Sequence, residues 1–180
     1  MVYVFLADGF EEIEALTPVD MLRRAGVAVT TLGVGGKKEI RGAHGIVVTA
    51  DAPDTAFDDE KPQMVVLPGG MPGAVNLDAS PVVTRALAAA AAGGGFLCAI
   101  CAAPLVLGHR GYLVGKKATC YPGFENELKG ARTERDAVVR DGNIITGAGM
   151  GVDLDFALSL VAALCGDETA ARLARGVLKA

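Results

Sequence analysis

Short apolar runs alternate with longer amphipathic stretches along this chain. Five runs rich in aliphatic and β-branched residues, most of them closed by glycine or proline, predict buried strands. They are Val2–Ala7, Val27–Val34, Gln63–Leu67, Gly95–Ile100 and Asn143–Thr146. Helical segments are expected at Ile13–Ala25, Pro81–Ala92, Ala103–His109, Asp153–Leu164 and Glu168–Leu178. Apolar strands separated by helices are typical of a mostly parallel sheet with helices on both faces, so we predict an α/β fold.

Two segments depart from this alternation. Glu39–Ala50 contains turn glycines at 42 and 45, and Asp136–Ile145 contains an Asp-Gly-Asn turn at 141–143. The second is a hairpin signal, so a small antiparallel hairpin is expected beside the parallel strands. We find no linker and no internal repeat, and 180 residues are enough for one core. Residues 1–180 are therefore predicted to form a single domain.

The composition narrows the classes of partner. Hydrophobic residues make up 51% and charged residues 21% of the chain, and the net charge is −4. That balance is typical of a folded protein and offers no basic surplus for nucleic acid. The purest apolar stretch, Phe156–Cys165, is too short to span a bilayer, and no basic segment precedes the first strand as in a signal peptide. With only four cysteines, we expect a cytoplasmic protein with reduced thiols and no membrane partner.

Glycine clusters follow two of the predicted strands. They lie at residues 69–73 and 147–151. In open α/β sheets ligands bind at the carboxyl ends of strands, where glycine lets backbone amides approach them, although both clusters are also compatible with simple tight turns. Neither cluster has the Gly-Lys-Ser/Thr of a phosphate-binding loop, and the later one fails the dinucleotide pattern at its last position. The sequence therefore predicts no nucleotide cofactor.

Cys101 lies where the strand ending at Ile100 turns into a helix near Pro104. Such a turn projects its central side chain above the sheet, toward the free amides of the first helical turn, which favour a thiolate. A buried, inert thiol remains the alternative. Cys98 and Cys101 also spell C-x-x-C, which leaves a redox dithiol open, although Cys98 is expected inside the strand. A zinc site would need more ligands than the scattered remaining cysteines and histidines supply, so no metal is expected.

Glu14 lies on the apolar side of its predicted helix. Glu11 and Glu12 are explained as acids that complement the helix dipole. Glu14, in contrast, falls at the angular position of Met21, among apolar residues, where a carboxyl group is costly to ionise. We expect it to be protonated and able to donate a hydrogen bond to a thiolate. Pro18 offers an alternative helix start, which would loosen this angular argument.

These motifs together, in this order along nearly the whole chain, resemble the DJ-one/ThiJ/PfpI superfamily, and specifically its branch around the Parkinson-associated protein deglycase. The matching stretches are Gly9-x-Glu11-Glu12-x-Glu14, Pro18-Val19-Asp20, Pro68-Gly69-Gly70, Ala99-Ile100-Cys101-Ala102-x-Pro104 and Gly149-x-Gly151. The resemblance implies a flavodoxin-like three-layer sandwich and a homodimer that uses the first helix. It makes Cys101 the reactive cysteine and Glu14 the protonated glutamate that hydrogen-bonds it.

The resemblance also implies an anion pocket at the backbone amides of Gly70 and Ala102, beside Gly69, with Tyr121 and Glu11 as further candidate pocket residues. Two positions depart from relatives. Tyr121 stands where many relatives have histidine, and Ala102 stands where the protease-like branch has histidine, so peptide hydrolysis is not expected. His44 and His109 are the two histidines, and His109, at a predicted helix end, is interpreted as solvated or capping.

The function implied is a cofactor-independent glyoxalase or deglycase that acts on small 2-oxoaldehydes or on glycated protein. An alternative of another class is a redox-responsive protective protein in which Cys101 is oxidised and turnover is minor. A third, a role in thiazole biosynthesis, is a label carried by some members of the superfamily, and the sequence lacks phosphate-binding features that would support it.

Overall fold

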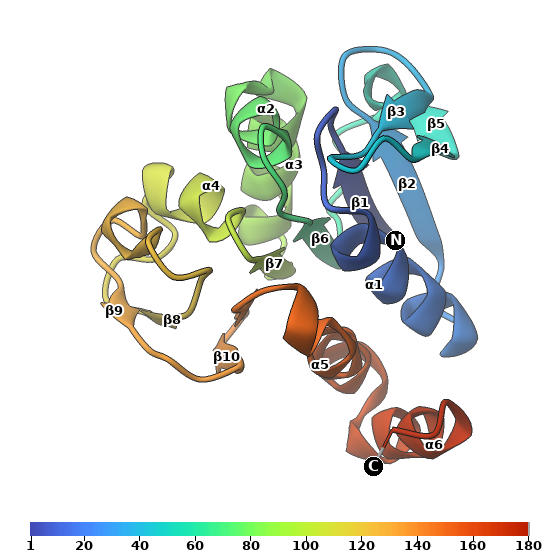
Figure 1. The fold of residues 1–180 in the computed structure, drawn as a ribbon, viewed down its shortest axis with the longest axis vertical. Coiled ribbons are helices and arrows are strands. Elements are labelled where there is room, and N and C mark those ends of the chain that lie inside the picture. The colour runs from blue at the N-terminus through green and yellow to red at the C-terminus, as the bar shows by residue number, and fades with distance from the viewer. Residues whose placement is uncertain (180) are drawn as a thin grey trace.

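A seven-stranded sheet forms the centre of the computed structural model, which describes residues 1–179 (Figure 1). The strand order is β10-β11-β7-β6-β1-β2-β5, and every neighbouring pair is parallel except β10 and β11. The strands are β1 (Val2–Leu6), β2 (Val29–Gly33), β5 (Ala52–Pro53), β6 (Met64–Leu67), β7 (Phe96–Ile100), β10 (Val138–Asp141) and β11 (Ile144–Gly147). The predicted α/β class and its mostly parallel sheet are confirmed.

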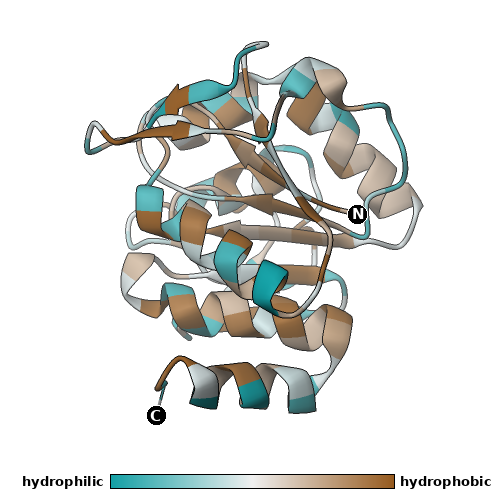
Figure 2. Cartoon of the chain, turned by 90° about the vertical axis from the view of Figure 1, so that its right-hand side faces the viewer, coloured by the Kyte–Doolittle hydropathy of each residue, from teal (hydrophilic) through white to brown (hydrophobic). Residues whose placement is uncertain are grey.

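Helices cover both faces of this sheet, as three layers require (Figure 1). On one face α1 (Glu12–Arg24) and α5 (Asp153–Cys165) pack against the sheet, and α6 (Asp167–Gly176) packs against α5. The other face packs against α2 (Gly73–Ala79), α3 (Pro81–Ala92) and α4 (Pro104–His109). β1 shows why both layers form, because its side chains alternate between the two cores and all five are buried. Figure 2 shows the same pattern, with hydrophobic colour along the central strands.

One antiparallel hairpin forms where the turn residues predicted it, and a second forms in the other segment that departs from the alternation. β10 and β11 pair across the Asp-Gly-Asn turn, and β3 (Glu39–Arg41) pairs with β4 (Val47–Thr49) in a separate two-stranded sheet. Three features were not predicted, namely α2, the short β5, and the parallel pair of β8 (Lys117–Ala118) and β9 (Arg132–Thr133). These elements span only two to seven residues, too few for a hydrophobic period to show.

Helix α1 runs through Pro18 without a break, so the alternative helix start there is wrong. The first helix therefore keeps the angular positions that place Glu14 among apolar residues. Among residues 1–179, no helix has the length and apolar character needed to cross a bilayer.

The sheet brings three separate chain segments to one edge. β6, β1 and β7 are neighbours, with β6 in the middle, and all three are parallel, so their carboxyl ends meet. The turn after β1 leads to α1, the turn after β6 contains Gly69 and Gly70, and the turn after β7 contains Cys101. This edge holds the candidate site.

Candidate active site

Cys101 lies at the sharp turn between β7 and α4. Its backbone has a φ of 62°, a left-handed conformation that is costly for a residue with a side chain and that clusters at functional sites. The Cys101 amide donates to the Gly147 carbonyl at 2.9 Å, and the Tyr121 amide donates to the Cys101 carbonyl at 2.9 Å. These two bonds, from different segments, hold the turn in place. The side chain is half-buried, and α4 begins at Pro104, slightly later than expected.

Glu14 is fully buried, as the helical periodicity predicts. Its Oε2 atom accepts a hydrogen bond of 3.0 Å from the Gly69 amide, which fixes the carboxyl group over the turn after β6. Its Oε1 atom has no well-aligned hydrogen-bond partner within the described residues. The carboxyl lies beside the Cys101 thiol and interacts with it. Cys101 and Glu14, which were predicted to act as a pair, are therefore neighbours.

Gly69 allows this approach because it has no side chain. A Cβ atom at this position would lie 2.6 Å from Glu14 Oε2 and 2.7 Å from Cys101 Cβ, both shorter than real contacts allow. The amides of Gly70 and Ala102 lie against the sulfur and lower the pKa of the thiol. The predicted amide pocket is thus present around Cys101.

The two acids of this pair influence each other's protonation. Burial raises the pKa of Glu14 to about 7; the hydrogen bonds with Cys101 and Gly69 act to lower this pKa, and the negative charges of Glu11 and Asp153 act to raise it. Burial, followed by the charge and hydrogen bond of Glu14, raises the pKa of Cys101 to about 12. Two buried acids cannot both ionise cheaply, so an ionised Glu14 opposes the expected Cys101 thiolate. One negative charge is available to the pair, and a thiolate forms only when Glu14 holds the proton.

Two further candidates occupy less direct positions. Glu11 caps α1, since its carboxylate accepts a 2.7 Å hydrogen bond from the Glu14 amide. It therefore positions the helix turn that bears Glu14. The Tyr121 side chain is 52% exposed, and its ring lies next to Gly149, where an added Cβ would be 3.2 Å from Cδ2. The Tyr121 backbone, rather than its hydroxyl, makes the contact with Cys101.

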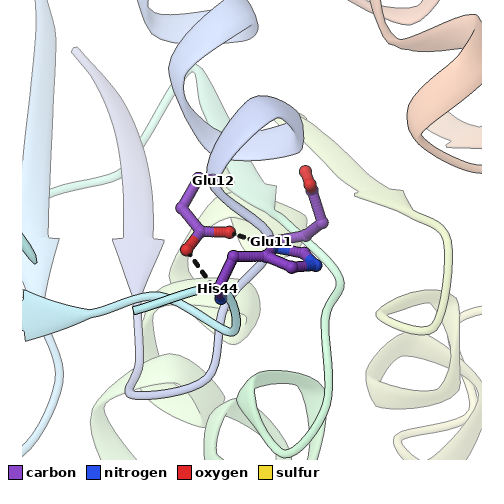
Figure 3. Close-up of side chains that lie close together, drawn as sticks. All are labelled: Glu11, Glu12 and His44. Carbon is purple, nitrogen blue, oxygen red and sulfur yellow. Dashed lines mark hydrogen bonds and ion pairs between the residues drawn. The ribbon is translucent and has the colours of Figure 1, made fainter. Parts of the chain in front are cut away.

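Glu12 and His44 join α1 to the loop between β3 and β4 (Figure 3). The Glu12 carboxylate is 4% exposed and accepts from the His44 amide at 2.8 Å, while its other oxygen lies 2.7 Å from His44 Nδ1. Potential ligand atoms of Glu11, Glu12 and His44 lie within 4.8 Å of one another. Both Glu12 oxygens and the Glu11 cap are already engaged, so we interpret the group as a structural tether.

A cavity of about 560 Å³ lies beside the reactive turn. Two of its lining residues, Cys120 and Ala148, are next in sequence to residues that hold the turn. These residues are Tyr121 and Gly147, which hydrogen-bond to the Cys101 backbone. Its walls are Thr119, Cys120, Pro122, Glu125, Thr133, Glu134, Arg135 and Ala148. The volume is in the range of small-molecule pockets.

Cys98 and His109 contribute to the packing of the fold. Cys98 is fully buried in β7, and burial raises its pKa well above the usual value, so an inert core thiol describes it better than a redox dithiol. His109 is exposed in the last turn of α4, as a solvated histidine at a helix end is expected to be. Its ring also bridges Asp78 at 2.8 Å and Glu127 at 2.9 Å, and these two partners come from distant segments that the sequence alone did not identify.

Sequence reasoning missed Asp153. It opens α5, is 2% exposed, and lies near enough to Glu14 for its charge to raise the pKa of that residue. In the sequence it looks like an ordinary acid in a first helical turn. Only its burial against α1 distinguishes it.

Comparison with known proteins agrees with this geometry. Residues 1–163 match the model of the DJ-1/PfpI family. Protein dj-1beta of Drosophila melanogaster is 37% identical over 98% of this chain and 96% of its own length. The glutathione-independent glyoxalase DJR-1.2 of Caenorhabditis elegans is 33% identical over 88% of this chain and 84% of its own. The solved structure of oxidized Toxoplasma gondii DJ-1 superposes with a TM-score of 0.95 at 36% identity, over 99% and 98% of the two chains. This chain belongs to the DJ-1/PfpI family, with its flavodoxin-like fold.

Proposed function

We propose that this chain is a cysteine-dependent enzyme of the glyoxalase or deglycase type, acting on small 2-oxoaldehydes or on their adducts with protein. The observation that carries the proposal is the pairing of Cys101, on a strained turn, with the buried Glu14 carboxyl and the amides of Gly70 and Ala102. A relative of this family carries the name of a glutathione-independent glyoxalase, which supports the same chemistry.

In the first step the Cys101 sulfur attacks the aldehyde carbon. The S–H proton passes to the Glu14 carboxylate as the carbon–sulfur bond forms, and the aldehyde oxygen becomes an alkoxide. The Gly70 and Ala102 amides, which already surround the sulfur, are the nearest donors for that oxygen. Protonation of the alkoxide gives a hemithioacetal. The pair needs no preformed thiolate, because one group gives up the proton that the other accepts.

In the following steps Glu14 moves a proton within the bound substrate. It removes the hydrogen of the former aldehyde carbon and returns a proton to the neighbouring carbonyl carbon. The hydroxyl proton of the hemithioacetal passes to the oxygen of that neighbouring carbon, and the product is a thioester of a 2-hydroxyacid. Water then cleaves the thioester and restores the thiol. The oxidation of one carbon balances the reduction of its neighbour, so no external electron acceptor is needed. A pKa of about 7 suits a group that must both accept and donate protons near neutral pH.

The test is formation of lactate from methylglyoxal. We expect turnover by the wild type, and a loss of at least about 100-fold in Cys101→Ser, since the nucleophile is removed. The matched control is Cys165→Ser, which replaces another partly exposed thiol at the far end of α5 and should retain activity. Equal turnover by Cys101→Ser and the wild type would show that Cys101 is not the nucleophile.

A second candidate function is redox response at the same cysteine. A family member from Toxoplasma gondii has been solved in an oxidized form, and Cys101 here is half-exposed beside two backbone amides that favour an anion. Peptide mass spectrometry after mild peroxide treatment separates the two candidates. Two added oxygen atoms confined to Cys101, together with negligible methylglyoxal turnover, would favour redox response over catalysis.

We also propose that the chain is a cytoplasmic homodimer that pairs through α1. Ile13 and Leu16 on this helix are 49% and 41% exposed, and the tethered β3–β4 loop adds Ile46 and Val47 at 56% and 46%. Apolar side chains gathered on one surface are typical of an interface. Size-exclusion chromatography with light scattering tests this, and a monomer at micromolar concentration would contradict it.

A further inference from the structure

Asp153 is a second buried acid next to the site. It is the first residue of α5, which packs against α1, and only 2% of its surface is exposed. Neither of its carboxyl oxygens has a well-aligned hydrogen-bond partner within the described residues. A buried polar side chain without a partner is costly, so its presence at this position points to a role.

Helix capping does not supply that role. An acid at a helix start is normally solvated or accepts a hydrogen bond from a backbone amide of the first turn. The start of α5 has no side-chain cap bond. Asp155, in the same first turn, behaves as expected for such an acid, because it is partly exposed and pairs with Lys179 at 3.0 Å. The Asp153 carboxyl group is instead buried inside the protein.

The side chain that Asp153 approaches belongs to α1. Thr17 lies one helical turn after Glu14, and its hydroxyl is close enough to lower the pKa of Asp153 without outweighing burial, which raises it to about 7. The charge of Asp153 in turn raises the pKa of Glu14, and Glu11 adds its charge to both. Cys101 is the other titratable neighbour of Glu14. Within residues 1–179, neither Glu14 nor Asp153 forms an ion pair with a lysine, arginine or histidine.

Three oxygens on two buried carboxyl groups therefore lack a well-aligned hydrogen-bond donor and a cation among residues 1–179. We propose that Asp153 is a positioning residue for the reactive pair, a second buried carboxyl group whose negative charge keeps the proton on Glu14 beside the Cys101 sulfur. Asp153 does not touch the sulfur, and it acts on Cys101 only through Glu14. The inference rests on the proposed function in one respect, namely that the proton on Glu14 serves Cys101.

The test is the titration of the Glu14 carboxyl carbon by NMR in the wild type, Asp153→Asn and Asp155→Asn. Asparagine keeps the shape of Asp153 and removes its charge. We expect the Glu14 midpoint to fall by about half a pH unit or more in Asp153→Asn, because a neighbouring negative charge is lost in a poorly solvated site. Asp155→Asn removes a charge from the same helical turn and should leave the midpoint in place. An unchanged midpoint in Asp153→Asn, or equal shifts in both variants, would overturn the proposal.

A second readout does not depend on that spectrum. A carboxyl group with a raised folded-state pKa favours the native state when protonated, and its penalty develops as pH rises from the unfolded pKa toward the folded one. Asp153→Asn should therefore gain stability over the wild type at pH 8 and lose most of that gain at pH 5. Asp153→Ser, smaller and uncharged, repeats the measurement if asparagine fails to fold. A gain that does not change with pH would contradict a buried charge.

Failure of this inference can be told apart from failure of the proposed function. If Cys101-dependent turnover is present and the Glu14 midpoint is the same in Asp153→Asn, the inference about Asp153 is wrong and the enzyme assignment stands. If the midpoint shifts but the wild type does not turn over 2-oxoaldehydes, the coupling stands and the proposed substrate class is wrong.

Discussion

Glu12 and Glu14 lie two residues apart on α1, and both are buried, but their proton affinities differ in direction. Burial acts to raise the pKa of Glu12, yet the hydrogen bonds and charge of His44 outweigh it, and the pKa lies below its usual value. Burial also raises the pKa of Glu14, to about 7, although hydrogen bonds with Cys101 and Gly69 act against the rise, and the charges of Glu11 and Asp153 add to it. Both carboxyl groups are shielded from solvent, but Glu14 lies deeper and has no cationic partner among residues 1–179.

This comparison shows that burial alone does not tell whether a carboxyl group is structural or exchanges protons with a neighbour. A buried carboxylate that is matched by a histidine and a backbone amide ties two segments together and stays ionised. A buried carboxyl group without a cation keeps its proton into the neutral range, where it can exchange it with a thiol. The depth of a buried acid and its partners together decide which of the two roles it takes.

The largest expected effect on turnover comes from a substitution that removes the exchangeable proton of the Glu14 carboxyl group and keeps the shape of the side chain. Glu14→Gln should lower turnover of methylglyoxal by about 10² to 10⁴-fold, the usual contribution of a general acid–base group. Glu12→Gln, at the neighbouring carboxyl group of α1, should stay within about 10-fold of wild type because it does not touch the reacting atoms. Steady-state kinetics with both variants measures this difference. Equal losses in the two variants would remove the distinction between them.

The next effect comes from filling the space that Gly69 leaves open. In Gly69→Ala the new Cβ would collide with Glu14 Oε2 and Cys101 Cβ, so the two groups must separate. A displacement near 1 Å costs about 100-fold in rate. Gly176→Ala, where nothing lies within 4 Å of the added atom, is the control. Kinetics that match the wild type in Gly69→Ala would show that the close approach is not needed.

A smaller effect concerns the pH dependence of stability. Because the folded-state pKa of Glu14 is raised, its ionisation destabilises the native state as pH rises from about 4.5 through 7. Glu14→Gln should therefore be more stable than wild type at pH 8 by roughly 2 to 3 kcal/mol, with the difference shrinking toward pH 5. Urea unfolding at the two pH values measures it. For Glu12, whose pKa is lowered, the sign reverses, and Glu12→Gln should be less stable at pH 8.

The smallest effect is expected at the tether. His44→Ala leaves one oxygen of Glu12 without its ring partner, and we expect a small decrease in the free energy of unfolding. The control is Arg24→Ala, which breaks an exposed ion pair with Asp20 on α1 and should decrease the free energy of unfolding less. Equal stability of His44→Ala and Arg24→Ala would mean that the tether has no measurable strength.

Local periodicity was enough to predict the main elements of this site. The alternation of strands and helices gave the parallel sheet, and the helical angle of Glu14 relative to Met21 gave its burial. The abrupt end of β7 before Pro104 identified the turn that bears Cys101. Each of these features depends on residues close together in the sequence.

The features that were missed depend on distant segments. His44 reaches Glu12 across 32 residues, and Asp153 approaches Thr17 from the other end of the chain. The charge of Glu14 on the Cys101 sulfur is likewise an interaction between distant segments, and it opposes the expected thiolate whenever Glu14 is ionised. Pairwise electrostatics between remote positions leaves no periodic signal in one sequence.

The central claim is that Glu14 and Cys101 share one proton near neutral pH. Its most direct measurement is the rate of Cys101 alkylation by iodoacetamide as a function of pH, in the wild type and in Glu14→Gln. We predict a rise in the wild-type rate centred near pH 7, where the pair loses its first proton, and loss of this rise in Glu14→Gln. Identical profiles in the two proteins, both following an ordinary free thiol, would contradict the account.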